Sequence, residues 1–254
     1  MGSAELGKER RAKADYTVAL AGNPNTGKST VFNALTGLSQ HTGNWPGKTV
    51  TRAEGRFITR GLVFGLIDLP GTYSLLANSV EEQVARDFIC FGKPDATVVV
   101  VDATCLERNL NLVLQVLEIT PRVVVCVNLI DEARRKHIEI DDRALSAELG
   151  VPVVCTAARN GHGLDRLVDT VRDVATGRIN TAPQIPRYDH QIEEALLKLE
   201  PRIRDLVGDR CSSRWLALRL LDRDRSVIAL LEQWAAGQPS VKVPINQSRG
   251  EILA

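Results

Sequence analysis

Residues 22–29 read Gly22-Asn23-Pro24-Asn25-Thr26-Gly27-Lys28-Ser29 and match the pattern GxxxxGK(S/T). They lie between a short β-rich run, Tyr16 to Ala21, and a segment with apolar residues at helical spacing, Lys28 to Thr36. A glycine-rich loop that joins a strand to a helix presents main-chain amides to a phosphate group. The pairing of Lys28 with Ser29 at this position favours a phosphate-binding loop (P-loop) over a purely structural glycine turn.

Each position of this loop has an expected role toward a bound nucleoside triphosphate. We expect Gly27 to let the main chain approach the phosphates, Lys28 to reach the β and γ oxygens, and Ser29 to ligate Mg²⁺. The other loop residues expected to contact the nucleotide are Asn23, Asn25, Thr26 and Thr30.

The alternation of apolar strand and helix continues beyond the loop. Strands this uniformly apolar must be covered on both faces, which single intervening helices achieve with right-handed crossovers onto a mostly parallel sheet. The pattern predicts a doubly wound α/β fold. Thr49 to Ile58 is less apolar and alternating, and suits an antiparallel edge strand. The expected strands are Leu62–Ile67, Ala96–Val101, Val123–Val127 and Val151–Cys155; the expected helices are Val80–Phe91, Leu110–Leu117, Asp141–Leu149 and Leu164–Ala175.

The chain changes character after Gly177. Asn180 to Pro186 holds two prolines and is typical of a linker, and the residues that follow fit two to four helices, with Pro201 breaking or kinking the first. A weak strand signal appears only at Val241 to Val243. We therefore expect a tail at 1–14, a nucleotide-binding domain at 15–180 and a small all-helical domain at 181–254.

Composition excludes several classes of function. The 254 residues include 32 Lys and Arg against 31 Asp and Glu, so no overall field favours a nucleic acid. The longest apolar runs are far shorter than the ~20 residues of a membrane helix, and no secretory signal is visible. We expect a soluble protein of the cytosol.

The cysteines form no CxxC pair and are expected mainly to pack in the core; they are Cys90, Cys105, Cys126, Cys155 and Cys211.

A second motif, Asp68-Leu69-Pro70-Gly71, directly follows the expected strand Leu62 to Ile67. There the Asp68 carboxylate would hold Mg²⁺ through its water shell, and the Gly71 amide would sense the γ-phosphate. A lone DxxG is a common turn, but its distance downstream of a P-loop favours the functional interpretation.

The segment between the first helix and Thr49 is rich in turn residues and carries an exposed-looking Trp45. It is a candidate switch loop, in which Thr49 offers its hydroxyl to Mg²⁺ and its amide to the γ-phosphate. The alternative is a simple surface loop followed by a β-forming threonine.

A third motif, Asn128-Leu129-Ile130-Asp131, ends the strand Val123 to Val127. The Asp131 carboxylate can accept the two hydrogen bonds that guanine donates and adenine does not, which selects guanine. Leu129 replaces the usual lysine of the NKxD pattern and is expected only to pack on the base. The alternative for Asp131 is a helix cap. Main-chain amides after the last strand are expected to close over the base; the residues are Thr156, Ala157 and Ala158.

With these segments in place, the chain closely resembles the N-terminal G domain of the bacterial ferrous-iron transporter B family through about Gly177. The resemblance implies a Ras-like P-loop GTPase followed by a helical domain similar to a nucleotide-dissociation inhibitor. Beyond the P-loop, the strings that carry it are Gly43-Asn44-Trp45-Pro46-Gly47-Lys48-Thr49-Val50, Asp68-Leu69-Pro70-Gly71-Thr72-Tyr73-Ser74-Leu75 and Leu106-Glu107-Arg108-Asn109-Leu110.

The resemblance also implies partners and a second cation. The family continues into a membrane domain that moves Fe²⁺ into the cytoplasm, which this chain lacks, so the expected location is the cytoplasmic face of the bacterial inner membrane. Small accessory iron-transport proteins and further copies of the chain are also among its expected partners. A K⁺ ion beside the phosphates, held by the Asn25 side chain and by carbonyls near Gly43 and Trp45, would replace an arginine finger.

Two departures bear on mechanism. Thr72 stands where Ras-like enzymes place a glutamine that orients water, so catalysis is assigned to Lys28, Thr49 and Gly71 without a side-chain base. The second departure is Leu129 in place of the usual lysine, which concerns the affinity for guanine, while the choice of base stays with Asp131. The leading hypothesis is a slow GTPase that gates or times iron transport. The alternatives are a ribosome-assembly or RNA-associated GTPase, and a switch that signals by nucleotide occupancy without meaningful hydrolysis.

Overall fold

The structure, a computed structural model, describes residues 14–37, 40–76, 78–208 and 211–235. Most of the expected N-terminal tail and the weak strand signal at Val241 to Val243 lie outside these residues. Within the described residues no helix combines the length and apolarity that crossing a membrane requires.

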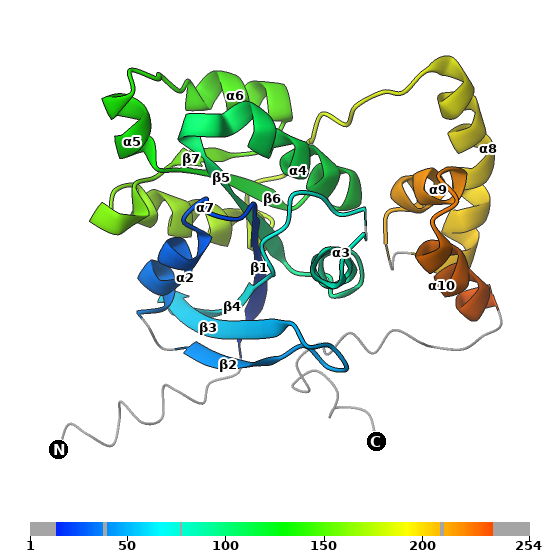
Figure 1. The fold of residues 1–254 in the computed structure, drawn as a ribbon, viewed down its shortest axis with the longest axis horizontal. Coiled ribbons are helices and arrows are strands. Elements are labelled where there is room, and N and C mark those ends of the chain that lie inside the picture. Colours follow the sequence, from blue (N-terminus) through cyan, green and yellow to red (C-terminus); the bar gives the residue numbers. More distant parts are fainter. Residues whose placement is uncertain (1–13, 38–39, 77, 209–210, 236–254) are drawn as a thin grey trace.

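The nucleotide-binding part is built on one seven-stranded sheet with the order β2-β3-β4-β1-β5-β6-β7 (Figure 1). Strand β1 pairs in parallel with β4 and β5, and the parallel pairing continues through β6 to β7. The predicted doubly wound, mostly parallel α/β fold is confirmed. The strands are β1 Tyr16–Gly22, β2 Gln40–Asn44, β3 Thr51–Thr59, β4 Leu62–Asp68, β5 Ala96–Asp102, β6 Val123–Asn128 and β7 Val153–Cys155.

The antiparallel part of the sheet is larger than expected. Strand β3 runs antiparallel to β4, as predicted, but it is not the edge, because β2 pairs with its other side. We expected a loop at β2, whose residues 41–44 are all exposed. Main-chain pairing, and not apolar burial, holds this strand, so it carries no alternating apolar signal.

Helices cover both faces of the sheet because successive strand residues point to opposite sides. Val18 and Leu20 of β1 lie in one core cluster with α2 and α7, whereas Ala19 and Ala21 lie in the other with α3 and α4. The helices are α2 Lys28–Thr36, α3 Val80–Phe91, α4 Leu106–Ile119, α5 Ile130–Arg135, α6 Asp142–Leu149 and α7 Leu164–Ala175; short 3-10 turns lie at η1 Ala103–Cys105 and η2 Ala158–Asn160.

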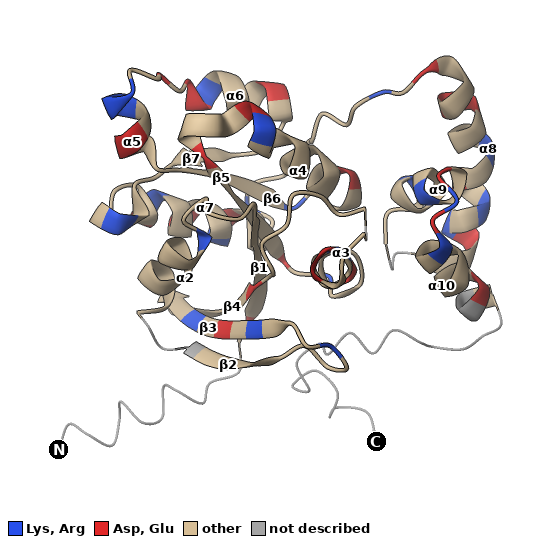
Figure 2. Cartoon of the chain, viewed as in Figure 1, with Lys and Arg blue, Asp and Glu red and all other residues tan. Residues whose placement is uncertain are grey.

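The described part of the tail after the linker is helical, as predicted, and bears charges of both signs (Figure 2). Of the break or kink expected at Pro201, the break is wrong, since α8 runs through this residue, and the kink stays a prediction. A proline inside a helix leaves the carbonyl four residues earlier without a donor. That residue is Leu197, whose 74% exposure allows water to replace the lost bond. The helices are α8 His190–Val207, α9 Ser213–Leu221 and α10 Arg225–Ala235.

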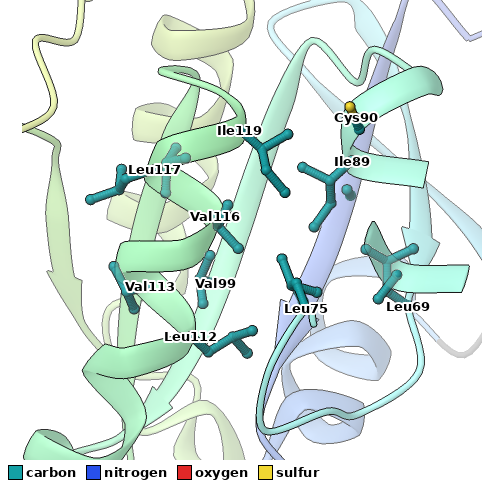
Figure 3. Packing of buried hydrophobic residues seen from close by; sticks show 14 of the residues in the cluster. Leu69, Leu75, Ile89, Cys90, Val99, Leu112, Val113, Val116, Leu117 and Ile119 are labelled. Atoms are coloured by element: carbon teal, nitrogen blue, oxygen red, sulfur yellow. The ribbon is translucent and has the colours of Figure 1, made fainter. Parts of the chain in front are cut away.

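The two parts of the chain share apolar packing. Trp215 and Leu216 of α9 belong to the same buried cluster as α3 and α4. Figure 3 shows this core at the facing sides of α3 and α4, where Ile89 and Val116 lie close to Leu75 of the segment that leads into α3. The helical tail is therefore docked on the sheet domain near the segment that contains the DxxG motif.

Candidate functional site

The P-loop has the geometry of an anion cradle. Asn25 and Gly27 adopt left-handed backbone conformations, with φ of 67° and 78°, between β1 and α2. Helix α2 has Gly27 as its N-cap, and no side chain caps it. The amides of its first turn are thus available to an anion, which the positive end of the helix dipole favours.

Asn128 ties this loop to two other predicted motifs. Its Nδ2 donates to the Thr26 carbonyl at 3.0 Å, while its Oδ1 accepts from Thr156 Oγ1 at 3.0 Å and from the Ala158 amide at 3.1 Å. Both Asn128 and Thr156 are buried. The structure therefore brings together the ends of β1, β6 and β7, as the order of motifs predicts for one edge of a parallel sheet.

The amides of residues 156–158 already have partners in the protein. Those of Thr156 and Ala157 donate to the carbonyls of Val127 at 2.8 Å and His162 at 3.1 Å, and that of Ala158 donates to Asn128. Contact of these amides with a base remains a prediction, because it requires sharing or exchanging those bonds.

Leu129 and Asp131 lie beside the P-loop at the start of α5. Leu129 is the N-cap and has a left-handed conformation, with φ of 63°, and no side chain caps the helix. A Cβ added to Gly27 would lie 3.8 Å from Leu129 Cδ2, so this side chain flanks the loop. Asp131 is half-buried in the first turn and is not the N-cap, which argues against the capping alternative.

Asp68 and Lys28 form a salt bridge across the site. Their side chains are 19% and 10% exposed. Burial raises the pKa of Asp68 above its usual range, and the positive charge of Lys28 opposes the rise. A carboxylate that desolvation disfavours is stabilised by a cation, and with the exposed Ser29 hydroxyl it offers the oxygen ligands that Mg²⁺ prefers. These residues fit the predicted magnesium site.

The DxxG segment lies directly on the P-loop. The Thr72 amide donates to the Gly22 carbonyl at 3.2 Å, and a Cβ added to Gly71 would lie 3.6 Å from Pro24 Cα. Asn23, the residue after Gly22, is buried, and no described group forms a hydrogen bond with its side-chain nitrogen or oxygen. Buried polar groups normally find partners, so an unpaired amide inside a P-loop fits a polar ligand.

The expectation of an exposed Trp45 is wrong, because this side chain is only 4% exposed. Its amide donates to the Val50 carbonyl and its carbonyl accepts from the Lys48 amide, both at 2.9 Å, so the chain turns back on itself. The ring lies edge-on to Phe88 of α3, with centroids 5.5 Å apart, and under the Arg52 guanidinium. The turn residues around Trp45 suggest an exposed loop, so the sequence gives no sign of this tertiary contact.

The other residues of this hairpin are held at the sheet edge. Gly43 pairs with Arg52 in the β2–β3 ladder, and Thr49 is exposed at the hairpin end. The hydrogen bonds and ring contacts of Trp45 lie within the hairpin, on β3 and on α3. Cation binding by Thr49, Gly43 and Trp45 therefore stays a prediction.

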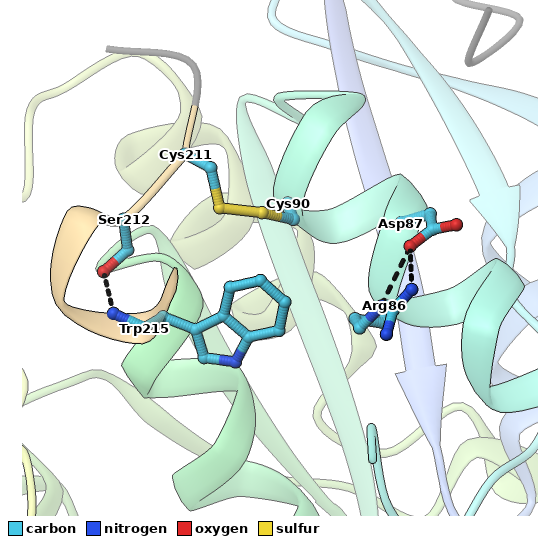
Figure 4. The surroundings of a disulfide bond; sticks show 6 residues. All are labelled: Arg86, Asp87, Cys90, Cys211, Ser212 and Trp215. Carbon is cyan, nitrogen blue, oxygen red and sulfur yellow. Dashed lines mark hydrogen bonds and ion pairs between the residues drawn. A yellow bond between two sulfur atoms is a disulfide. The ribbon is translucent and has the colours of Figure 1, made fainter. Parts of the chain in front are cut away.

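Sequence reasoning missed a disulfide between Cys90 and Cys211, which are 121 residues apart with Cα atoms 5.4 Å apart (Figure 4). No local spacing could reveal a pairing over such a distance.

Of the remaining cysteines, Cys126 does pack in the core, where burial raises the pKa of its thiol to about 12; Cys155 is half-buried and Cys105 is exposed. The core-packing expectation is thus correct for Cys126 and for Cys90, which is 3% exposed; the bond that Cys90 forms with Cys211 is what the expectation missed.

Comparison with known proteins points to one family. The family described as ferrous iron transport protein B matches residues 16–171, and the family described as the FeoB cytosolic helical domain matches residues 188–252. The Fe(2+) transporters FeoB of Salmonella typhimurium LT2 and Escherichia coli K12 are each 40% identical over 215 residues, covering 82% of this chain. That alignment spans 27% of the length of each relative.

Solved structures agree with these matches. The cytosolic domain of the T. maritima FeoB iron transporter in a GDP form has a TM-score of 0.80 at 37% identity, covering 92% of this chain and 91% of that one. The same domain in its GMPPNP form gives 0.78 at 36% identity, with coverage of 92% and 91%. The cytosolic domain of L. pneumophila FeoB gives 0.74 at 32% identity, with coverage of 85% and 93%.

Proposed function

The chain belongs to the ferrous iron transport protein B family, and from that premise we propose that it binds GTP, hydrolyses it slowly and so gates or times Fe²⁺ passage through a membrane domain. The observation that carries the proposal is the junction at Asn128, which joins the P-loop to the loop after β7. Asp68 and Gly71 lie against the other side of the same P-loop. Relatives in this family were solved in GDP and GMPPNP forms, which supports a guanine nucleotide as the ligand.

The phosphate chemistry is assigned to main-chain amides and one lysine. The first-turn amides of α2 and the loop around Gly27 bind the phosphates, and Lys28 leaves its contact with Asp68 to bind the β and γ oxygens. Ser29, Asp68 and Thr49 would hold Mg²⁺, whose charge would offset the negative charge that develops on the phosphate oxygens. Gly71 offers its amide to the γ-phosphate, and no side chain of the segment acts as a base.

Guanine selection is assigned to Asp131, and Leu129, which lies beside Gly27 of the P-loop, is assigned apolar packing on the base. Equilibrium titration of labelled GDP and of ATP measures it. Asp131→Asn keeps the size of the side chain but loses an acceptor, and we expect GDP affinity to fall by about a hundredfold while ATP binding stays weak. Asp165→Asn, exposed in the first turn of α7, is the control. ATP binding as tight as GTP binding contradicts the assignment.

The dependence of phosphate release on potassium distinguishes GTP hydrolysis from a switch that only binds nucleotide. Asn25 is exposed at the P-loop in a left-handed conformation, which suits a K⁺ ligand. Phosphate release is measured in potassium and then in sodium, with Asn25→Ala beside the unchanged chain. We expect stimulation by potassium that the substitution removes. Tight GTP binding with no phosphate release in either salt favours the occupancy switch instead.

The remaining assignments concern location and partners. We propose domains at 15–180 and 181–254, placed at the cytoplasmic face of a bacterial inner membrane and coupled to a membrane domain. Small accessory iron-transport proteins and further copies of the chain are partners for the same complex. The ribosome-associated alternative loses support because the residues after the linker match a FeoB helical domain and carry both signs of charge.

A further inference from the structure

One face of α3 carries two links to the helical tail. Arg86 and Cys90 are four residues apart and so lie on the same side of this helix. Cys90 is bonded to Cys211, which directly precedes Ser212, the N-cap of α9 (Figure 4). The disulfide therefore connects α3 to the start of α9.

The second link is polar. The Arg86 side chain, 5% exposed, donates to Ser226 Oγ at 2.9 Å and to Asp224 at 3.5 Å. Asp224 also accepts from the amides of Ser226 and Val227 at 2.9 and 3.3 Å at the start of α10. These contacts form a second, polar link between α3 and the tail, one that does not depend on the disulfide.

Helix α3 is also the element that adjoins both candidate switch segments. It begins directly after the segment that follows DxxG, and its Phe88 contacts Trp45 of the hairpin. Leu75 of that segment packs in the same cluster as Ile89 and Cys90, as Figure 3 shows. A bond that restrains α3 therefore also restrains the two candidate switch segments that pack against it.

We propose that the Cys90–Cys211 disulfide is a reversible redox latch that restrains α3 when oxidised and frees it when reduced. The Arg86 contact keeps the tail docked in both states. This proposal rests on the proposed function only for the measurement of nucleotide release, because the bond and the mobility of α3 can be measured without a nucleotide. The DxxG segment packs on the P-loop, so we expect a restraint on α3 to slow nucleotide release in the oxidised form.

The co-reactant is a dithiol reductant. Its thiolate attacks the sulfur of Cys211, because the Cys211 residue is half-buried whereas Cys90 is only 3% exposed. A mixed disulfide forms, and Cys90 leaves with the electron pair of the S–S bond and takes a proton. The second thiol of the reductant then displaces Cys211, which is protonated in turn. The protein gains two electrons and two protons, and the reductant becomes its own disulfide.

The test uses the full 254-residue chain, poised oxidised or reduced with dithiothreitol. Peptide mapping after alkylation measures the bond, amide hydrogen exchange measures the mobility of α3, and labelled GDP measures nucleotide release. We expect reduction to speed both exchange in residues 80–91 and GDP release by about fivefold. The Cys90→Ser, Cys211→Ser double variant should match the reduced chain and ignore the reductant. Cys105→Ser, which leaves the pair intact, should respond like the unchanged chain.

The latch is overturned if no Cys90–Cys211 peptide forms under oxidising conditions, or if exchange across α3 is equal in the two poised forms. Failure of the proposed function is a different result, in which GDP does not bind while mapping and hydrogen exchange still report the latch. Normal GDP binding with release rates equal in both forms also overturns it, since the restraint then does not reach the switch segments.

Discussion

The Asn128 side chain packs so closely against Gly27 that there is no room for a larger residue at position 27. A Cβ at Gly27 would lie 2.4 Å from Asn128 Nδ2, closer than real carbon atoms approach, and the Asn128 side chain is held by three hydrogen bonds. Gly27 also has a φ of 78°, where L residues other than glycine are strained.

We expect Gly27→Ala to weaken GDP binding by at least about tenfold, or ~1.4 kcal/mol, because Asn128 must move from the loop that it holds. Isothermal titration measures the change. Gly37→Ala is the matched control, since Gly37 has a φ of 59° and open space around its Cβ position. The control carries only the backbone strain and should leave affinity unchanged. Equal losses in both variants refute the argument from contact.

At the scale of elements, the β2–β3 hairpin carries Gly43, Trp45 and Thr49, the residues predicted to contact the cations. Trp45 reports on it, because the ring is buried against Phe88 in this structure. With Trp215 and Trp234 replaced by phenylalanine, we expect the Trp45 emission to shift to longer wavelength when GMPPNP and Mg²⁺ are added. GDP alone should leave it unchanged. A spectrum that is the same in all states shows that this hairpin is not a switch.

The pairing of α8 with α9 has a pH signature. Arg214 donates two hydrogen bonds to Glu193, at 2.7 and 3.0 Å, and they lower the pKa of that carboxyl to about 2 from the ordinary 4.5. A depressed pKa means that the stabilisation is complete above 4.5 and is lost as pH falls toward 2.

Glu193→Gln should therefore lower the thermal midpoint at neutral pH and flatten its dependence on pH between 4.5 and about 2. Differential scanning calorimetry across that range measures both effects. Glu194→Gln is the control, because Glu194 is exposed and has only a distant histidine partner at 3.9 Å. If both variants follow the same curve as the unchanged chain, the ion pair does not stabilise the helical tail.

For the whole molecule, the disulfide spans the junction between the sheet domain and the helical tail. Closing a loop of 121 residues removes entropy from the unfolded chain, with an upper estimate of about 5 kcal/mol. We expect reduction to lower the thermal midpoint by roughly 10 °C for a chain of this size. Scanning calorimetry with and without dithiothreitol measures it. The Cys90→Ser, Cys211→Ser variant should melt at the reduced value under both conditions, and a midpoint that still responds to the reductant rules out this bond as the cause.

The tail is also attached without the disulfide. Tyr188, just before α8, donates its hydroxyl to Glu118 of α4 at 2.5 Å, and the Ala182 and Gln184 amides of the linker bond to the end of α6. These contacts hold the linker and the start of the tail to the sheet domain, which is consistent with the buried cluster that α9 shares with α3 and α4.

The amino-acid sequence by itself determined the P-loop, the parallel strands and the covering helices, because each is a local pattern of period or spacing. Lys28 to Thr36, Val80 to Phe91 and Leu164 to Ala175 form helices with the predicted bounds. Only the tertiary structure decided the edge strand β2, the burial of Trp45 and the Cys90–Cys211 bond. Each of these depends on a partner far along the chain or on main-chain pairing, and neither leaves a pattern in neighbouring residues.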